Sequence, residues 1–362
     1  MLTDEMTASA SLLGMSTEEL RTLAQQEGET AYRGGQLARW LYLHGVRTYE
    51  EMSNLPEAFR VRLSQKYRIG RGHVVVSQHS KDGTTKLLLE MADGARIETV
   101  GLPYPDRVSC CVSTQVGCPI GCAFCATGSS GYTRDLSAGE IVDQVLCVRE
   151  SVQGESQQNR GGPSRVDHVV FMGMGEPLLN YDATTKAVQL LNAELGIAMR
   201  QLTVSTVGFV PGIRRLAQDK PQFTLAVSLH APTDELRRQL VPGMTRWGVA
   251  EIIEACREYV RRTGRRVTFE YCLLGGVNDA PAEAGELSRV LRGLNSHVNL
   301  IAWNPVLGLG FRAPSRERIR AFREVLEDAG IPVTQRLERG SDIDAACGQL
   351  RRRTGEGASG GE

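Results

Sequence analysis

The stretch Cys118-Pro119-Ile120-Gly121-Cys122-Ala123-Phe124-Cys125 holds three of the nine cysteines of the chain. Three residues separate the first two of these cysteines, and two residues separate the second from the third. Thiols crowded in this way predict a metal site. Three thiolates can hold one cube of iron and sulfide and leave one iron without a protein ligand. Because a structural site normally takes four protein ligands, the triplet predicts a site kept open for another molecule.

The same cysteines allow two other interpretations. They could bind zinc together with a distant His, or they could be buried thiols without any ligand. Gly117, Pro119 and Gly121 bend the loop, and this bend together with the spacing favours an open iron–sulfur cluster. The predicted ligands of one [4Fe–4S] cluster are Cys118, Cys122 and Cys125.

Length and composition limit the class of protein. The 362 residues are enough for one α/β barrel and an appendage. The 42 basic and 42 acidic side chains balance, which neither supports nor excludes a nucleic-acid partner. The first residues lack a signal-peptide pattern, apolar runs are far shorter than the roughly 18 residues that span a membrane, and an odd number of cysteines does not fit a secreted disulfide framework. We therefore expect a cytoplasmic protein with no membrane partner.

Short helices are predicted within residues 1–70. Ser16 and Glu19 form a capping-box pattern, and Thr48 with Glu51 predicts the start of another helix. We expect this segment to form a helical accessory domain that either binds nucleic acid or caps the barrel, and its composition favours neither of these roles.

An antiparallel β meander is predicted for residues 71–105. Asp82-Gly83 and Asp93-Gly94 separate runs with strand character, and Asp-Gly is a strong hairpin signal. The predicted strands are His73–Gln78, Lys86–Met91 and Arg96–Val100. The meander would link the helical domain to the larger domain that begins near residue 106.

Strands and helices alternate over residues 106–305. The predicted strands lie near residues 108–113, 166–172, 200–206, 222–229, 266–273 and 297–303. The predicted helices lie near residues 138–151, 181–195, 209–218, 247–263 and 281–294. Six such units predict an α/β fold built on a partial parallel (β/α)6 barrel, with its chemistry at the carboxyl ends of the strands. The polar stretch Gln153–Ser164 is predicted to be a loop, and residues 306–362 a C-terminal extension with a disordered tail.

Polar residues stand where these strands end. The turn Gly173-Met174-Gly175-Glu176-Pro177 follows an apolar strand, and its glycines would let a ligand approach the backbone. Ser205, Ser228-Leu229-His230 and Asn304 end three further strands. Each alone is more often a capping or core residue, but together they could contact a nucleoside at one mouth. On the first strand, Cys110 and Cys111 are adjacent, so at most one of them faces into the barrel.

The cysteine motif, with an aromatic residue before its last Cys, resembles that of radical S-adenosylmethionine enzymes, where the open iron chelates the methionine end of the cofactor. A glycine-rich turn like the one ending in Glu176 binds the cofactor's ammonium group there. Over residues 10–353 the chain resembles the RlmN/Cfr family of RNA adenine methyltransferases. The segments that carry this resemblance are CVSTQVGC, CAFCATG, GEIVDQV, GMGEPLLN, SLHAPTDELR, VTFEYCLLGGVND, WNPV and DIDAACGQL.

The resemblance implies a reaction. The RlmN branch methylates adenosine carbon 2 in 23S rRNA, at the peptidyl transferase centre, and in tRNA beside the anticodon. The Cfr branch methylates carbon 8 of the ribosomal adenosine and is the alternative. The RlmN branch fits better because of the helical N-terminal module, the sequence IETV around Glu98 and the tail around Cys347. A radical enzyme with a non-RNA substrate and an electron-carrying or structural iron–sulfur protein are the other classes considered.

The resemblance also implies roles for residues. Cys347 would accept a methyl group from one S-adenosylmethionine, and a second S-adenosylmethionine at the cluster would provide the radical that removes a hydrogen from this methyl. The methylene would then add to the adenine and link protein to RNA. Glu98 would accept a proton, although a Glu on a hairpin strand is ordinarily a surface residue. Cys111 would attack the Cys347 sulfur, release the product and leave a transient disulfide.

The family's cofactor contacts carry over by position. The residues implied to bind S-adenosylmethionine are Gly175, Glu176, Ser205, Ser228, Leu229, His230 and Asn304. The implied partners are 23S rRNA, tRNA and an electron donor of the flavodoxin or ferredoxin type. We expect a monomer.

Overall fold

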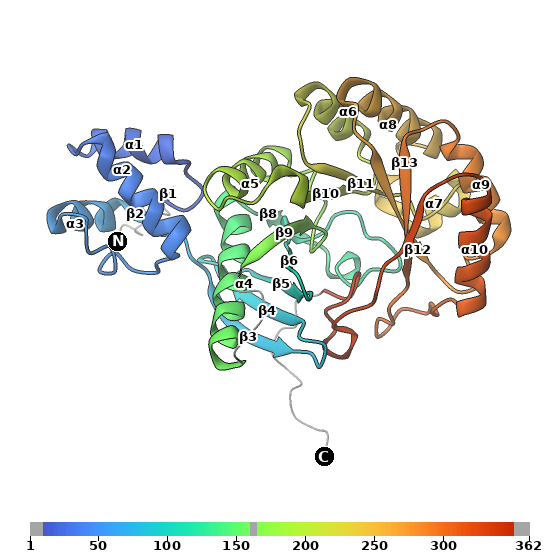
Figure 1. Cartoon of the computed structure of the whole chain (residues 1–362), viewed down its shortest axis with the longest axis horizontal. Helices are drawn as coiled ribbons and strands as arrows, with labels where there is room; N and C mark the ends of the chain where they lie inside the picture. Colours follow the sequence, from blue (N-terminus) through green and yellow to red (C-terminus); the bar gives the residue numbers. More distant parts are fainter. Residues whose placement is uncertain (1–9, 160–164, 351–362) are drawn as a thin grey trace, which may run out of the picture.

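The computed structural model describes residues 10–159 and 165–350. Figure 1 shows a small helical module, in blue, beside a larger body built on one twisted sheet. Every helix within these residues is too short or too polar to span a bilayer.

The helical module comprises short elements that enclose a small core. Its elements are β1 (Ala10–Ser11), α1 (Thr17–Gln26), α2 (Ala31–Ala38), the π-helical turn η1 (Arg39–His44), α3 (Glu57–Lys66) and β2 (Tyr67–Arg68). The predicted capping box is confirmed, since Ser16 Oγ accepts a hydrogen bond from Glu19 N and Glu19 Oε2 accepts one from Ser16 N. The helix predicted at Thr48 is wrong. Glu51 Oε1 instead closes a turn by accepting from the backbone N–H groups of Arg47 and Thr48, and Pro56 prevents a helix from running through this segment.

One sheet carries the larger body. In the described part of the chain its order is β14-β13-β12-β11-β10-β9-β6-β5-β4-β3. The strands are β3 (His73–His79), β4 (Thr85–Glu90), β5 (Arg96–Pro103), β6 (Val108–Cys111), β9 (Val166–Phe171), β10 (Leu202–Thr206), β11 (Thr224–Ser228), β12 (Val267–Leu273), β13 (Ser296–Ala302) and β14 (Val333–Gln335). The meander β3–β6 is antiparallel, and the sheet is parallel from β6 to β14.

The sheet does not close on itself, because β14 and β3 are its two edges. This confirms the partial barrel predicted from the sequence. The meander is the antiparallel continuation of the same sheet, since β5 pairs directly with β6. The strand β14 extends the parallel part beyond the six predicted strands. The domain boundaries at residues 70, 105 and 305 stay predictions.

Helices lie along the outer side of the parallel strands (Figure 1). They are α4 (Ala138–Asn159), α5 (Tyr181–Ala193), α6 (Val210–Asp219), α7 (Asp234–Leu240), α8 (Val249–Thr263), α9 (Pro281–Leu291) and α10 (Arg316–Asp328). All five predicted helices are present, and α7 and α10 were not predicted. The loop predicted from Gln153 is wrong as far as Asn159, because α4 continues through this stretch, which is rich in the helix-favouring residues Glu and Gln. The rest of that prediction lies outside the described residues.

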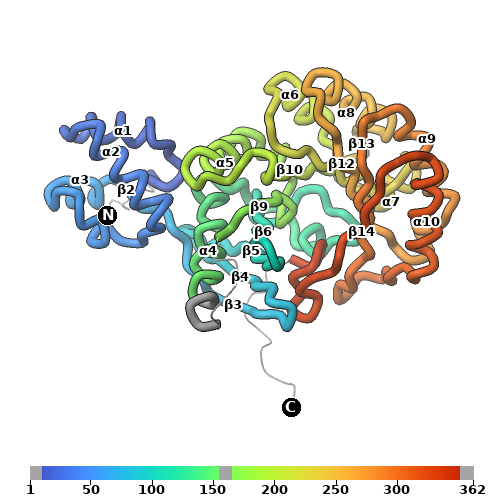
Figure 2. The backbone as a smooth tube through the Cα atoms, viewed as in Figure 1, coloured from blue at the N-terminus to red at the C-terminus, as the bar shows by residue number. Residues whose placement is uncertain are grey.

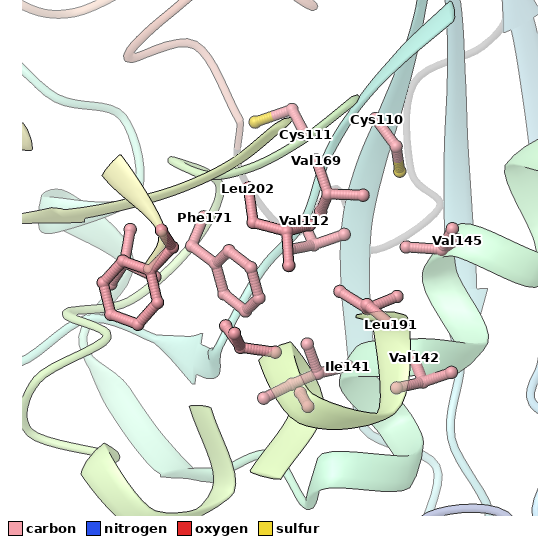
Figure 3. Packing of buried hydrophobic residues seen from close by; sticks show 14 of the residues in the cluster. Cys110, Cys111, Val112, Ile141, Val142, Val145, Val169, Phe171, Leu191 and Leu202 are labelled. Carbon is pink, nitrogen blue, oxygen red and sulfur yellow. The ribbon is translucent and has the colours of Figure 1, made fainter. Parts of the chain in front are cut away.

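Two apolar clusters hold these layers together. In the larger one, Val169 and Leu202 of the sheet pack against Ile141 of α4 and Leu191 of α5 (Figure 3). The smaller cluster lies under the cysteine loop and contains Ile120, Phe124, Val241, Leu274 and Trp303. It positions the loop against the ends of the strands.

Candidate active site

The cysteine loop is held between two short antiparallel strands, β7 (Gln115–Gly117) and β8 (Tyr132–Asp135). Gly117 has φ +81°, and a Cβ there would lie 1.8 Å from Gly131 O, so only glycine fits. Trp303 Nε1 donates to Phe124 O at 2.9 Å and fixes the far side of the loop. The loop therefore presents its thiols in one defined place.

A cavity opens at the carboxyl ends of the strands, and all three motif cysteines line it. Burial raises the pKa of the Cys118 thiol to about 12, and it also raises the pKa of Cys122 well above the ordinary value. A thiol in such a place loses its proton only when a metal takes up the charge. No three potential ligands among the described residues converge on one point as a single metal ion requires. In an iron–sulfur cube each thiolate binds a different iron, so the arrangement fits a [4Fe–4S] cluster.

The turn after β9 forms one wall of this cavity. Glu176 Oε1 accepts from Leu178 N at 3.0 Å and Oε2 from Val207 N at 2.8 Å. Burial raises the pKa of this carboxyl to about 7, although these two N–H groups lower it. Close packing requires a glycine at position 175, because a Cβ there would lie 2.6 Å from Gln115 Cβ. The tight approach of the turn to β7 thus places Glu176 at the cavity.

The next strand ends contribute hydroxyls and an imidazole. Ser205 and Ser228 line the cavity, and their Oγ atoms lie 3.3 Å apart. His230 Nδ1 accepts from Cys272 N at 3.0 Å, and burial, helped by the charge of Arg237, lowers the His230 pKa to about 3. His230 is therefore neutral and can offer its other ring nitrogen to a ligand.

Two residues expected at the cofactor lie elsewhere. The Leu229 side chain is fully buried, and its carbonyl accepts from the buried guanidinium of Arg237. Asn304 lines a second cavity, and its Nδ2 donates to Cys347 O at 3.3 Å. Their cofactor role stays a prediction.

The second cavity is lined by both Cys111 and Cys347. Cys347 also lines the first cavity and so stands at the junction of the two. The segment that carries it folds back onto the meander, as the red end of the tube in Figure 2 shows. It is fixed by bonds from Gly340 N to Asp82 Oδ2 (3.0 Å) and from Thr127 Oγ1 to Leu350 O (2.6 Å). All nine cysteines lie in the described residues, and none forms a disulfide.

Glu98 is buried, so the expectation that a Glu on a hairpin strand lies at the surface is wrong here. Its Oε1 lies 3.3 Å from Lys86 Nζ, which also donates to Asp344 O at 3.2 Å in the Cys347 segment. Glu98 is two residues from Val100, the partner of Cys111 across β5 and β6, so Glu98 and Cys111 face the same side of the sheet. Its role as proton acceptor stays a prediction.

Sequence reasoning missed three charged residues of the site. Arg336 follows β14 and lines both cavities, and Glu270 lies in β12 with Oε2 accepting from Asn299 Nδ2 at 2.8 Å. The buried Arg237 of α7 ties the ends of β10 and β11 by donating to Val207 O and Leu229 O. Glu270 could have been found, since a lone carboxylate in the apolar run VTFEYCL calls for a partner.

Comparison with known proteins decides the family. Residues 112–286 match the Radical SAM superfamily, and residues 10–69 match the ribosomal RNA large subunit methyltransferase N-terminal domain. The probable dual-specificity RNA methyltransferase RlmN of Gloeobacter violaceus is 51% identical over 344 residues, which are 95% of each chain. The chain belongs to the RlmN family. The RlmN relative from Thermosynechococcus vestitus is 48% identical over 94% of this chain and 98% of its own.

A solved structure agrees with this membership. The radical SAM methyltransferase from Sphaerobacter thermophilus superposes with a TM-score of 0.89 at 46% identity, covering 94% of this chain and 99% of that one. As a member of the RlmN family, the chain is a radical S-adenosylmethionine methyltransferase that uses a [4Fe–4S] cluster.

Proposed function

We propose that this enzyme methylates carbon 2 of adenosine in 23S rRNA, at the peptidyl transferase centre, and in tRNA, beside the anticodon. The observation that carries the proposal is the position of Cys347 at the junction of two cavities, with Cys111 in the wall of the second. The RlmN relatives, named as dual-specificity RNA methyltransferases, support the choice of RNA. The proposal includes a flavodoxin- or ferredoxin-type electron donor, a monomeric state and a cytoplasmic location.

The two cavities have different chemistry. The first brings together the three cluster cysteines, Glu176 and the Ser205 and Ser228 hydroxyls, and suits the cluster with S-adenosylmethionine. The second holds the two remaining reactive thiols and suits the target adenine. A group carried on Cys347 can reach both, so a methyl received on one side can be delivered on the other.

The thiols solve a chemical problem. Carbon 2 of adenine is electron-poor and has no nucleophilic character, so it cannot attack a sulfonium methyl group. A thiolate can, and in this proposal Cys347 accepts the methyl. When bound, the cluster and S-adenosylmethionine supply the radical chemistry that makes this methyl reactive.

The chain's own residues complete the reaction. Glu98 accepts the proton that leaves carbon 2, and its Oε1 lies 3.3 Å from Lys86 Nζ. The adduct also gives up its unpaired electron, which the cluster or its electron donor would take up. Cys111 attacks the Cys347 sulfur, which forms a disulfide for later reduction and breaks the carbon–sulfur bond to the product. The electron pair of that bond stays on the released carbon, which takes up a proton and becomes the methyl group. Arg336 lines the second cavity with both thiols. Burial raises the pKa of Cys111 to about 12, and the Arg336 charge opposes this rise.

The test is nucleoside mass spectrometry of 23S rRNA and tRNA from a strain that lacks the gene. The proposal expects 2-methyladenosine to disappear from both RNAs, and to return with the wild-type gene but not with Cys347→Ala. Loss of 8-methyladenosine alone would assign the enzyme to the carbon-8 branch, and unchanged RNA would contradict the proposal.

A further inference from the structure

An aromatic ring flanked by two cations stands at the second cavity. Tyr104 lies in the turn between β5 and β6, and the guanidinium carbons of Arg107 and Arg339 each lie 4.4 Å from its ring centroid. Tyr104 and Arg339 line the cavity together with Cys111 and Cys347. The turn leads into the strand of Cys111, and Arg339 belongs to the segment that carries Cys347.

The charges of the two arginines are poorly balanced. Arg339 Nη1 donates to Pro103 O at 2.6 Å, and within the described residues no carboxylate lies at ion-pair distance from Arg339. Arg107 pairs with Asp106 at 3.1 Å, but both side chains are exposed, with 37% and 72% of their surface accessible, so the pair is weak. Two like charges held against one ring repel each other. An anion that contacts these guanidinium groups would reduce this cost.

The surroundings limit the size of such an anion. The carboxylate of Glu338 also lines the cavity. The nearby carboxylate of Asp82 already accepts hydrogen bonds from Thr84 N and Gly340 N, one on each oxygen. The rim is therefore no broad basic surface, and its spare donors suit one small anionic group. Guanidinium N–H groups form a fork that matches the oxygens of a phosphate.

We propose that Arg107, Tyr104 and Arg339 bind one phosphodiester of the RNA backbone next to the target nucleotide. The inference rests on the proposed function, because the anion belongs to the strand whose adenine enters the cavity. The Tyr104 ring holds the guanidinium groups in place, so little side-chain entropy is lost when the phosphate binds. The contact fixes how far the RNA strand enters and hence which base reaches Cys347. Arg107, Tyr104 and Arg339 are positioning residues, since they do not touch the reacting atoms.

The experiment compares the affinity of wild-type and Arg339→Gln for an RNA stem-loop that contains the target adenosine, over a range of salt concentrations. Loss of one phosphate contact should weaken binding about 5- to 10-fold and reduce the slope of log affinity against log salt by about 0.7–0.9. Arg289→Gln is the matched control, because Arg289 is exposed on α9 and paired with Glu286. It should leave affinity and slope unchanged.

A second arm locates the phosphate. Neutral methylphosphonate is substituted at single linkages around the target adenosine. One linkage should weaken binding to wild-type and have no further effect in Arg339→Gln. Tyr104→Leu, which keeps both charges, should weaken binding while the salt slope stays at the wild-type value.

The outcomes separate the explanations. The S-methyl content of Cys347, measured by peptide mass without RNA, should be equal in wild-type and Arg339→Gln. A loss of S-methylation would show that Arg339 is only structural and overturn the inference, as would a wild-type salt slope or equal sensitivity of both proteins at every linkage. If wild-type enzyme methylates RNA and Arg339→Gln binds RNA with the same affinity and salt slope, this inference alone is overturned. Wild-type enzyme that neither binds nor methylates RNA contradicts the proposed function itself.

Discussion

Cys110 and Cys111 are neighbours on β6, yet their side chains lie on opposite faces of the sheet (Figure 3). Cys110 pairs with Gly101 and turns toward Val145 of α4, whereas Cys111 pairs with Val100 and turns toward the cavity of Cys347. The two-residue period of a strand makes this separation obligatory. Two adjacent thiols of the same type therefore have different access to the site.

The first prediction rests on this separation. Cys111→Ala should form the covalent protein–RNA adduct and then stall, because Cys111 is the one other cysteine among the described residues that lines the second cavity with Cys347. Cys347→Ala should never attach to RNA, and Cys110→Ala should turn over normally. The measurement is a gel shift that resists thiol reagents and disappears with ribonuclease. Trapping by Cys110→Ala together with turnover by Cys111→Ala would show that the resolving role is assigned to the wrong thiol.

The second prediction concerns the cluster. Protein reconstituted without oxygen should contain about four irons per chain, the content of one cubane. Cys118→Ala, Cys122→Ala and Cys125→Ala should each lose cluster stability and cleavage of S-adenosylmethionine. The measurements are iron analysis and product chromatography, with Cys256→Ala as the control, since Cys256 is buried in α8 away from the loop. Active protein that contains zinc and no iron would contradict the assignment.

The third prediction concerns an ion network that joins the helical module to α4. The buried Arg71 contacts the buried Asp143, which also accepts from Gly72 N at 2.7 Å, and Arg71 Nη2 lies 2.7 Å from Glu150 Oε1. Removing one partner strands a buried charge, so Arg71→Met should lower the free energy of unfolding by about 3–5 kcal/mol. The measurement is urea unfolding.

An exposed ion pair serves as the control for that measurement. Arg323→Gln breaks the pair with Glu327 on α10 and should cost less than about 0.5 kcal/mol. Equal losses for Arg323→Gln and Arg71→Met would show that burial does not strengthen the Arg71 network.

The fourth prediction is a pH dependence at Asp82. Burial tends to raise the pKa of this carboxyl, but hydrogen bonds from Thr84, Gly340 and Ser80 outweigh it and lower the pKa from 3.8 to about 2. Because the folded pKa is lowered, the stabilisation is present above about pH 4 and is lost as the pH falls toward 2. Asp82→Asn should therefore lower the urea midpoint at pH 7, and its difference from wild-type should shrink between pH 4 and pH 2. A difference that is constant with pH would show that the charge of Asp82 contributes nothing.

Local patterns were sufficient for most of the fold. Apolar runs and Asp-Gly turns predicted the meander and the six central strands, and the glycine-rich motif after β9 marked a strand end at the cavity. Contacts between distant segments were not readable from such patterns. The bond from Gly340 to Asp82 brings the C-terminal segment onto the meander, and this fold-back places Asn304 in the second cavity and Arg336 at the junction. The sequence around Glu98 did not indicate that this side chain is buried, because its partner Lys86 lies on a different strand.

The central claim is that the methyl group travels through Cys347 and loses a hydrogen there before it reaches the base. The most direct measurement uses S-adenosylmethionine with a trideuterated methyl group and mass spectrometry of the modified nucleoside. The account predicts 2-methyladenosine with two deuterium atoms, because one is removed on Cys347 and a hydrogen replaces it when Cys111 releases the product. A product that retains all three deuterium atoms would mean that the methyl passed intact to the adenine, and would contradict the account.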